Sequence, residues 1–204
     1  RPHFNSYGFG ADRASLAGVP HFHECAFTGE FPIATLHFEE EKFPGQVEMK
    51  AFNPFIPTNE DDSGIPGAFF EFSVTNTTDR ELAYTIGFTM NNLYASGGGT
   101  HTPYEKEGCT LLHLTNRNQD PEDVDYGDLC MAAMGGEIGI QQYWYRGSWF
   151  DNLATYWKEF SSPGRLQNRV YDGKKAETDP NYAADDLAVL TSTVRIRPKD
   201  TGTF

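Results

Sequence analysis

The segment whose residue types could most readily act in catalysis runs from Ala51 to Asn76 and reads AFNPFIPTNEDDSGIPGAFFEFSVTN. It holds two adjacent carboxylates, Asp61 and Asp62, between two apolar runs. A glycosidase needs two carboxylates about 5 to 9.5 Å apart on either side of one bond, and neighbouring loop residues rarely reach that arrangement. The prolines favour extended backbone and strand ends, while Asp and Ser close turns. The segment is therefore predicted to turn a corner between two strands, and its two carboxylates are not predicted to act as an acid and a base.

Histidines offer a second kind of chemistry, because His21 and His23 stand one residue apart, just ahead of Glu24 and Cys25. Two imidazoles at that spacing share one face of a strand and can bind a metal together. The other histidines that the fold could bring close are His3, His37, His101 and His113. An isolated pair without a matched partner motif is a weak metal signature. We therefore expect no metal site and no cofactor.

Nucleophilic and phosphate-binding motifs find no support in the chain. The glycine-rich segment SGGGT at 96–100 lacks the lysine of a phosphate loop, and no GxSxG sequence is present. Cys130 lies in an apolar run with no base assigned to it. The three cysteines Cys25, Cys109 and Cys130 show no CxxC spacing. They are expected to be reduced thiols of a cytoplasmic protein, and no catalytic residue is assigned.

The densest aromatic group is Tyr143, Trp144, Tyr145 and Trp149, with Arg146 among them. Exposed aromatic rings stack on sugars, so this group is a candidate sugar contact. Interfaces between domains are also rich in Trp, Tyr and Arg, so docking to another domain is favoured over sugar contact. Packing in the protein core is the plainest alternative.

The charge of the chain excludes several classes of partner. Among 204 residues, 29 Asp and Glu outnumber 16 Lys and Arg, which gives a net charge of −13. Such a surface repels the phosphates of nucleic acids and of anionic membranes, whereas neutral sugars remain compatible with it. No apolar run approaches the ~20 residues of a membrane helix, and no signal-peptide pattern is present.

Alternation of apolar and polar residues predicts strands over most of the chain. In QVEMKAF, Val47 and Met49 face one way while Gln46 and Glu48 face the other. The predicted strands cover 31–38, 46–52, 68–74, 81–90, 110–114, 129–134, 139–146 and 185–197. The strands 68–74 and 81–90 are predicted to form a hairpin over the turn 76–79, and residues 1–26 are predicted to be irregular.

One helix is predicted, from an N-cap at Asp151 through Phe160. The pattern is typical of an all-β protein, a two-sheet antiparallel β-sandwich with long loops and about one short helix. We expect residues 1–204 to form a single domain. Because the chain begins at Arg1 and a β-like pattern stops at Phe204, we also expect it to be an excerpt of a longer polypeptide.

The stretch EFPIATLHFEEEKFPGQVEMKAFNPFIPTNEDDSGIPGAFFEFSVTN resembles the N-terminal domain of glycoside hydrolase family 116. That family includes the non-lysosomal glucosylceramidases and bacterial β-glucosidases and β-xylosidases. The resemblance runs from Phe27 to Tyr84, and its core is the segment 51–57 followed by Asp62-Ser63 and Ile65-Pro66.

The resemblance implies a β-sandwich that packs on a larger C-terminal (α/α)6 helical domain, where a retaining β-glycosidase holds both of its catalytic carboxylates. We therefore expect this chain to be the non-catalytic partner of such a domain, inactive alone, in an enzyme acting on a β-glycoside. The alternative is a stand-alone carbohydrate-binding module that holds sugar on the aromatic group. A structural domain of another glycosidase family is the third possibility, because sandwiches serve many functions.

Overall fold

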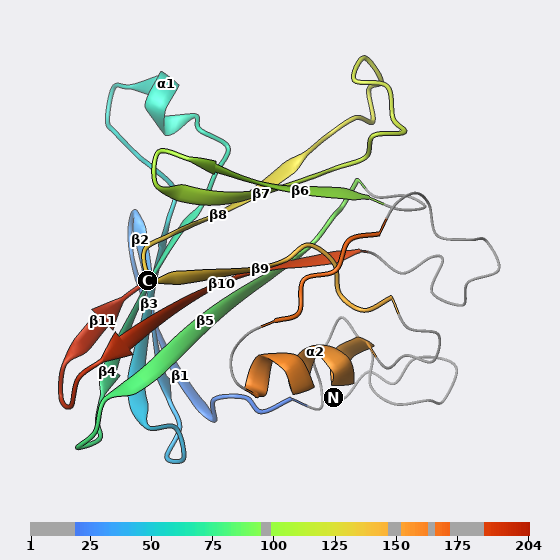
Figure 1. Cartoon of the computed structure of the whole chain (residues 1–204). Helices are drawn as coiled ribbons and strands as arrows, with labels where there is room; N and C mark the ends of the chain where they lie inside the picture. The colour runs from blue at the N-terminus through green and yellow to red at the C-terminus, as the bar shows by residue number, and fades with distance from the viewer. Residues whose placement is uncertain (1–18, 95–98, 147–151, 163–165, 172–185) are drawn as a thin grey trace. The chain divides into compact units, whose positions relative to one another are not determined.

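Strands dominate the computed structural model, which describes residues 19–94, 99–146, 152–162, 166–171 and 186–204. Figure 1 shows its strands and helices in chain order. The elements are β1 Glu24–Glu30, β2 Ile33–Glu39, β3 Gly45–Phe52, α1 Glu60–Ser63, β4 Phe69–Asn76, β5 Leu82–Asn91, β6 Thr100–Lys106, β7 Cys109–Thr115, β8 Leu129–Met134, β9 Glu137–Gln141, α2 Asn152–Ser161, β10 Leu187–Ile196 and β11 Thr201–Thr203.

The described chain divides into two compact units. Unit 1 contains Val19 and the described residues of Thr85–Ser192, and unit 2 contains Pro20–Tyr84 with Thr193–Phe204. The strands β5 and β10 each contribute residues to both units. The expectation of a single domain over 1–204 stays a prediction.

Unit 2 is built on one five-stranded sheet with the order β1-β2-β3-β4-β11. The pairs are antiparallel, and Val47 of β3 lies opposite Phe38 of β2 and Val74 of β4. Since successive side chains of a strand point to opposite faces, this register gathers apolar residues on one face. Val47 and Val74 are buried there, as the alternation in the sequence predicted for Val47.

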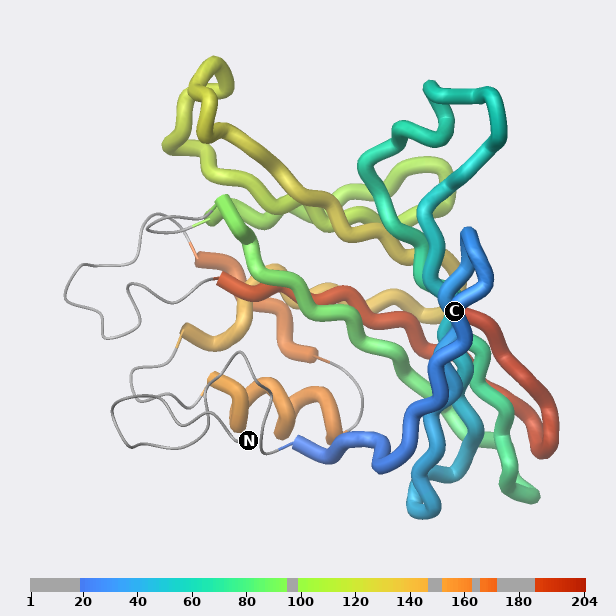
Figure 2. Tube along the Cα trace, turned by 180° about the vertical axis from the view of Figure 1, so that it is seen from behind, coloured from blue at the N-terminus to red at the C-terminus, as the bar shows by residue number. Residues whose placement is uncertain are grey.

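The corner predicted between residues 52 and 69 is confirmed as the connection of a long hairpin. β3 pairs with β4 from Gly45 opposite Asn76 to Phe52 opposite Phe69. The loop 53–68 joins the two strands and carries the single-turn helix α1, which the sequence did not predict. In Figure 2 this loop extends beyond the end of the sheet, at the same end as the turn between β1 and β2.

Unit 1 contains two three-stranded sheets, of order β5-β10-β9 and β6-β7-β8. Buried residues of both sheets meet in one cluster, which joins Leu112 and Leu114 of β7 to Ala188 and Leu190 of β10. Met131 of β8 completes its buried centre. Two sheets packed over a shared apolar layer form a sandwich, so the predicted all-β fold class is confirmed.

The predicted helix is present as α2, Asn152–Ser161, while its predicted cap Asp151 lies outside the described residues. The helix packs on β5, because a Cβ placed on Gly87 would lie 2.8 Å from the ring of Phe160. The hydroxyl of Tyr156 also hydrogen-bonds to Thr89. Because Gly87 has no side chain, the ring of Phe160 can lie directly against the backbone of β5.

Two predictions about strand ends were wrong. β1 begins at Glu24, inside the stretch 1–26 predicted to be irregular, and the predicted strand 139–146 stops at Gln141. Pairing with β2 stabilises β1, whose seven residues are all exposed and show no buried alternation. The strands β6 and β11 were also missed.

The predicted hairpin between 68–74 and 81–90 was wrong as well. β4 pairs with β3 and β11, whereas β5 pairs with β10 in another sheet. The buried side chain of Asn76 donates to the carbonyls of Arg80 and Ile196, 2.8 and 3.0 Å away. These bonds fix the turn so that the chain leaves the sheet of β4.

Candidate functional site

The carboxylates Asp61 and Asp62 lie in α1, and both are exposed. Asn59 caps this helix by accepting a hydrogen bond from the backbone N–H of Asp62, at 3.1 Å. The Asn59 amide also donates to Oδ2 of Asp62 at 2.6 Å. Asp62 therefore closes a turn, as a short polar side chain at a helix start commonly does.

Two further side chains hold the loop 53–68 in shape. Asn53 donates from Nδ2 to the carbonyl of Gly67 at 2.5 Å and to that of Ile65 at 3.3 Å. Ser63 accepts from the N–H of Ile56 at 2.9 Å and donates to its carbonyl at 3.1 Å. The polar residues of the loop thus satisfy its own backbone, which supports the interpretation of the segment as a rigid connection.

The histidines considered as metal ligands contact separate partners. His21 and His23 precede β1, so they do not share a strand face, and Nδ1 of His23 contacts Glu40. His37 lies 3.2 Å from a carboxylate oxygen of Glu48. The remaining two described histidines are His113, bound to Asp128, and His101, bound to the carbonyl of Gln142. His3 lies outside the described residues, and within them no three His, Cys, Asp or Glu side chains form a group that could hold a metal.

The pairing of β7 with β8 places His113 opposite Cys130, a neighbour that the sequence did not indicate. The Nε2 of this imidazole lies 2.7 Å from Oδ2 of Asp128. The thiol of Cys130 contacts the carbonyl of Met131 at 3.5 Å and the hydroxyl of Tyr104 at 3.9 Å. A base must bond the nucleophile to activate it, and this pair does not meet that condition. All three cysteines are free thiols.

Tyr143, the first of the four aromatic candidates, is buried in unit 1. Its hydroxyl donates to the carbonyl of Gly99 at 2.9 Å and accepts from the N–H of His101 at 3.0 Å. Its ring stacks on the His101 ring with 4.3 Å between centroids. Burial raises the pKa of the Tyr143 phenol above its usual value. The Tyr143 hydroxyl therefore links the segment after β9 to Gly99 and His101 at the start of β6.

The other three candidates differ in exposure. Trp144 is 3 % exposed and stacks on Tyr156 of α2 with 4.4 Å between ring centroids. Tyr145 is 39 % exposed, and the guanidinium of Arg169 lies 5.9 Å from its ring. Trp149 lies outside the described residues. Of the described three, Tyr145 alone presents a large part of its ring to solvent.

Arg146, next in the chain, forms a buried ion pair that sequence reasoning missed. It donates two hydrogen bonds to Asp186, which is 40 positions away. The same guanidinium lies 4.5 Å from the ring centre of Tyr171 and 5.4 Å from that of Tyr143. No local pattern marks such a pair, because its partners are 40 positions apart in the chain.

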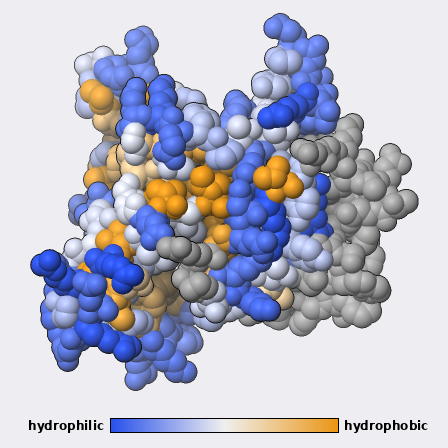
Figure 3. Space-filling view, viewed as in Figure 1, coloured by the Kyte–Doolittle hydropathy of each residue, from blue (hydrophilic) through white to orange (hydrophobic). Residues whose placement is uncertain are grey.

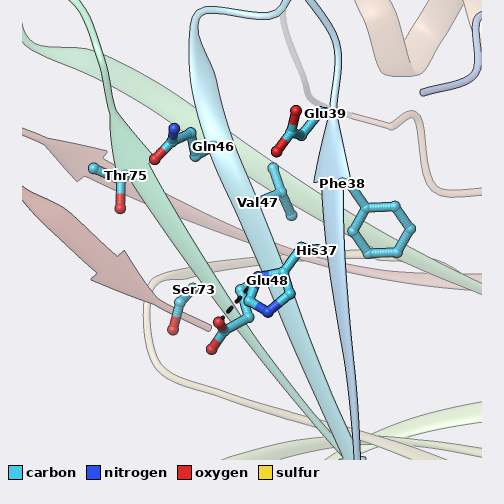
Figure 4. Close-up of a pocket in the computed structure, with 8 residues that line it drawn as sticks. All are labelled: His37, Phe38, Glu39, Gln46, Val47, Glu48, Ser73 and Thr75. Carbon is cyan, nitrogen blue, oxygen red and sulfur yellow. Dashed lines mark ion pairs between the residues drawn. The ribbon is translucent and has the colours of Figure 1, made fainter. Parts of the chain in front are cut away.

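A trough of about 370 Å³ lies on the polar face of the sheet of unit 2. It is lined by His37, Phe38, Glu39, Gln46, Val47, Glu48, Ser73 and Thr75 (Figure 4). Figure 4 shows His37 and Glu48 turned toward one another, with Ser73 beside them. Glu39 of β2 and Glu48 of β3 project from the same face of one sheet, whereas the two acids of a glycosidase act from opposite sides of the bond. The trough can offer hydrogen bonds but no opposed acid and base.

One comparison with known proteins identifies the family. A family model described as beta-glucosidase 2, glycosyl-hydrolase family 116 N-term, matches residues 6–204. The chain belongs to this family. The match confirms the resemblance seen between Phe27 and Tyr84 and extends it over residues 6–204 of the chain. The chain is thus a glycosidase-associated domain. Within its described residues, no helix is long and apolar enough to cross a membrane.

Proposed function

We propose that this family 116 N-terminal domain is the non-catalytic β domain of a retaining β-glycosidase and packs on a helical catalytic domain of the same enzyme. The observation that carries the proposal is the family match over residues 6–204, whose description names a β-glucosidase and an N-terminal region. The substrate of the whole enzyme would be a β-glucoside or a related β-glycoside.

The geometry of the carboxylates supports a non-catalytic role. Asp61 and Asp62 are neighbours in one helical turn, and Asp62 is bonded to Asn59. In the trough, Glu48 is paired with His37 and lies 3.4 Å from the ammonium of Lys50. A retaining mechanism needs two carboxyl groups about 5 Å apart on opposite sides of the sugar, and these acids are arranged otherwise.

The four aromatic candidates remain proposed contacts to the catalytic domain or to sugar. Tyr145 is the described residue that best fits such a role, because its ring is partly exposed beside Arg169. Tyr143 and Trp144 would support it from within the unit, since both are buried. The predicted cytoplasmic location also remains a proposal, supported by the three free cysteines.

The test compares this chain with the longer polypeptide that carries the proposed catalytic domain. Both are assayed on aryl β-glucosides, and the anomer first released is identified by NMR. The longer polypeptide is expected to release the β anomer, and this chain is expected to release no product. Turnover by residues 1–204 alone would contradict the proposal.

The alternative, a stand-alone sugar-binding module, predicts a different result. Gluco- and xylo-oligosaccharides would then change the tryptophan fluorescence of this chain in a saturable way. That change would disappear in Tyr145→Ala and Trp149→Ala. No saturable change is expected from a domain whose role is to pack on a catalytic partner.

A further inference from the structure

One end of the sheet of unit 2 carries an exposed apolar surface on a chain that is otherwise strongly acidic. The surface, here called the apolar tip, consists of Phe31, Phe52, Phe55, Ile56, Ile65 and Phe69. Phe31 is 82 % exposed, while Phe55, Ile56 and Ile65 are 51 %, 47 % and 46 % exposed. Single exposed apolar side chains are normal, but a contiguous group marks an interaction site.

Ring contacts join four of the six side chains of the tip in two pairs. The rings of Phe31 and Phe55 meet edge to face with 5.1 Å between centroids, which joins the β1–β2 turn to the loop 53–68. Phe52 and Phe69 face each other across the strand pair and stack with 5.4 Å between centroids. Figure 3 shows hydrophobic atoms among hydrophilic ones on the loop that carries α1. The β1–β2 turn and the two ends of the loop 53–68 thus place these side chains at the same end of the sheet.

The tip is also held rigid before any partner binds. The amide of Asn53 ties the two ends of the loop, and Ser63 makes two hydrogen bonds to the backbone of Ile56. Three prolines, Pro54, Pro57 and Pro66, fix backbone angles within it. Binding to a rigid loop costs little ordering entropy, and rigid aromatic anchors dominate the energy of interfaces.

Charges limit the kind of surface that can cover the tip. The loop 53–68 carries three acids, Glu60, Asp61 and Asp62, and no Lys, Arg or His. All three acids lie in α1, which stands between Ile56 and Ile65 in the sequence of the loop. Charge complementarity therefore requires a partner that is apolar at its centre and bears Lys or Arg at its rim.

The position of the last strand favours one occupant. β11 runs antiparallel to β4 from Thr201, opposite Thr75, to Thr203, opposite Ser73. Phe204 then pairs with Phe72 through two backbone hydrogen bonds of 2.9 and 3.1 Å. The strand thus leads toward the end of β4 at which Phe69 and the tip lie. A domain joined after this strand would reach the tip over a short span.

We infer that the apolar tip is the docking surface for the catalytic domain of the same enzyme, through an apolar patch rimmed by basic residues. This inference rests on the proposed function and names the residues that carry its interdomain contact.

The experiment places a benzophenone photocrosslinker at position 31 of the longer polypeptide that includes the catalytic domain. A phenyl ring that is mostly exposed tolerates this replacement. We expect crosslinks within one polypeptide to a segment outside residues 1–204 that contains Lys or Arg. The matched control places the same group at Val124, which is 95 % exposed in unit 1, and is expected to give at most a tenth of that yield.

A second variant tests the charges of the rim. Glu60→Gln together with Asp61→Asn should lower the crosslink yield from position 31 at least threefold at 50 mM salt. The loss should shrink at 500 mM salt, because salt screens exposed charges. Asp62 is left unchanged since it bonds to Asn59.

Several results overturn the inference: crosslinks only within residues 1–204, crosslinks only between two polypeptides, or no crosslink above the control. The activity of the longer polypeptide on aryl β-glucosides is measured in parallel. If the longer polypeptide is active but the expected crosslink is absent, the inferred docking surface is wrong and the proposed function is not contradicted. If residues 1–204 alone are active, the proposed non-catalytic function is wrong.

Discussion

Arg146 donates two hydrogen bonds to the carboxylate of Asp186, from Nε at 3.1 Å and from Nη2 at 2.9 Å. Their side chains are 14 % and 2 % exposed, so the pair is nearly removed from water. Asp186 also accepts the N–H of Gly99 at 3.2 Å. The pair therefore joins three segments of unit 1 that are far apart in the chain.

Replacing the arginine leaves a buried carboxylate without its main partner. Arg146→Ala is expected to lower the free energy of unfolding of unit 1 by about 3–5 kcal/mol. Arg146→Lys should recover only part of the lost stability, because an ammonium keeps the positive charge but cannot make the bidentate contact of a guanidinium. All three tryptophans, Trp144, Trp149 and Trp157, fall in the sequence range of unit 1, so urea unfolding followed by tryptophan fluorescence reports on this unit.

The matched control is Lys158→Ala, at an exposed position of α2. It should change the free energy of unfolding by no more than about 0.5 kcal/mol. A loss below about 1 kcal/mol in Arg146→Ala would show that the buried pair does not stabilise unit 1.

The pair Glu159 and Arg169 predicts a dependence of stability on pH. The hydrogen bond from Arg169 holds the pKa of the Glu159 carboxyl below its usual value. A depressed folded-state pKa adds stability above the unfolded-state value of about 4.3 and loses it as the pH falls through the folded-state value. Wild type should therefore exceed Glu159→Gln in unfolding free energy at pH 7, and the difference should shrink below about pH 4.

The measurement is urea unfolding of both proteins between pH 3 and 7. Arg169→Ala provides the control, because it removes the main donor and leaves the carboxylate in place with the hydrogen bond from Nε2 of Gln141, 3.0 Å away. In that background the difference that Glu159→Gln makes at pH 7 should be smaller than in the wild type. A difference between wild type and Glu159→Gln that stays constant from pH 7 to pH 3 would contradict the assignment.

The close approach of Gly87 to Phe160 predicts a steric coupling between β5 and α2. A methyl group at Gly87 would lie 2.8 Å from the Phe160 ring, which must then move. Tyr156 stacks on that ring with 5.7 Å between centroids, so the ring has little room to turn. Gly87→Ala should destabilise unit 1 by about 1–3 kcal/mol, as overpacking does.

A double-mutant cycle separates the clash from other effects of the alanine. Phe160→Leu removes the ring edge, so Gly87→Ala should cost at least about 0.5 kcal/mol less in that background. Thermal unfolding of the four proteins gives the coupling energy. Equal costs of Gly87→Ala in both backgrounds would place the strain elsewhere.

Asn53 is predicted to keep the loop 53–68 closed. Its amide donates to the carbonyls of Ile65 and Gly67, so Asn53→Ala removes both ties between the ends of the loop. We expect a stability loss of about 1 kcal/mol and a several-fold faster cleavage after Glu60 by a glutamate-specific protease. Gln46→Ala, at an exposed position of β3, serves as the control. Unchanged cleavage in Asn53→Ala would mean that the prolines alone hold the loop.

Most strands could be predicted from the sequence because alternation is a local property. The inward direction of Val47 and the outward direction of Glu48 follow from a period of two residues, whatever the partner strand is. The turn made by the loop 53–68 could also be predicted, since proline and short polar side chains restrict or hydrogen-bond the backbone close to them in the sequence. The exposed strand β1 was not, because its order depends on pairing with β2.

The candidate site was less predictable, since burial is a property of the folded chain. Tyr143, Trp144 and Tyr145 are adjacent and chemically alike, yet two are buried and one is partly exposed. The apolar tip escaped prediction for the same reason. Phe31 and Phe55 meet only after β1, β2, β3 and β4 have formed one sheet.

The sequence by itself determined the position of most strands of this family 116 domain, which face of β3 is apolar, and where the long hairpin turns. Only the tertiary structure decided that β4 pairs with β11 instead of β5, and that Asp186 lies against Arg146. The physical reason is that side-chain alternation and turn chemistry act over a few residues. Strand partners and buried ion pairs depend on contacts between segments up to 130 positions apart, which alternation cannot specify.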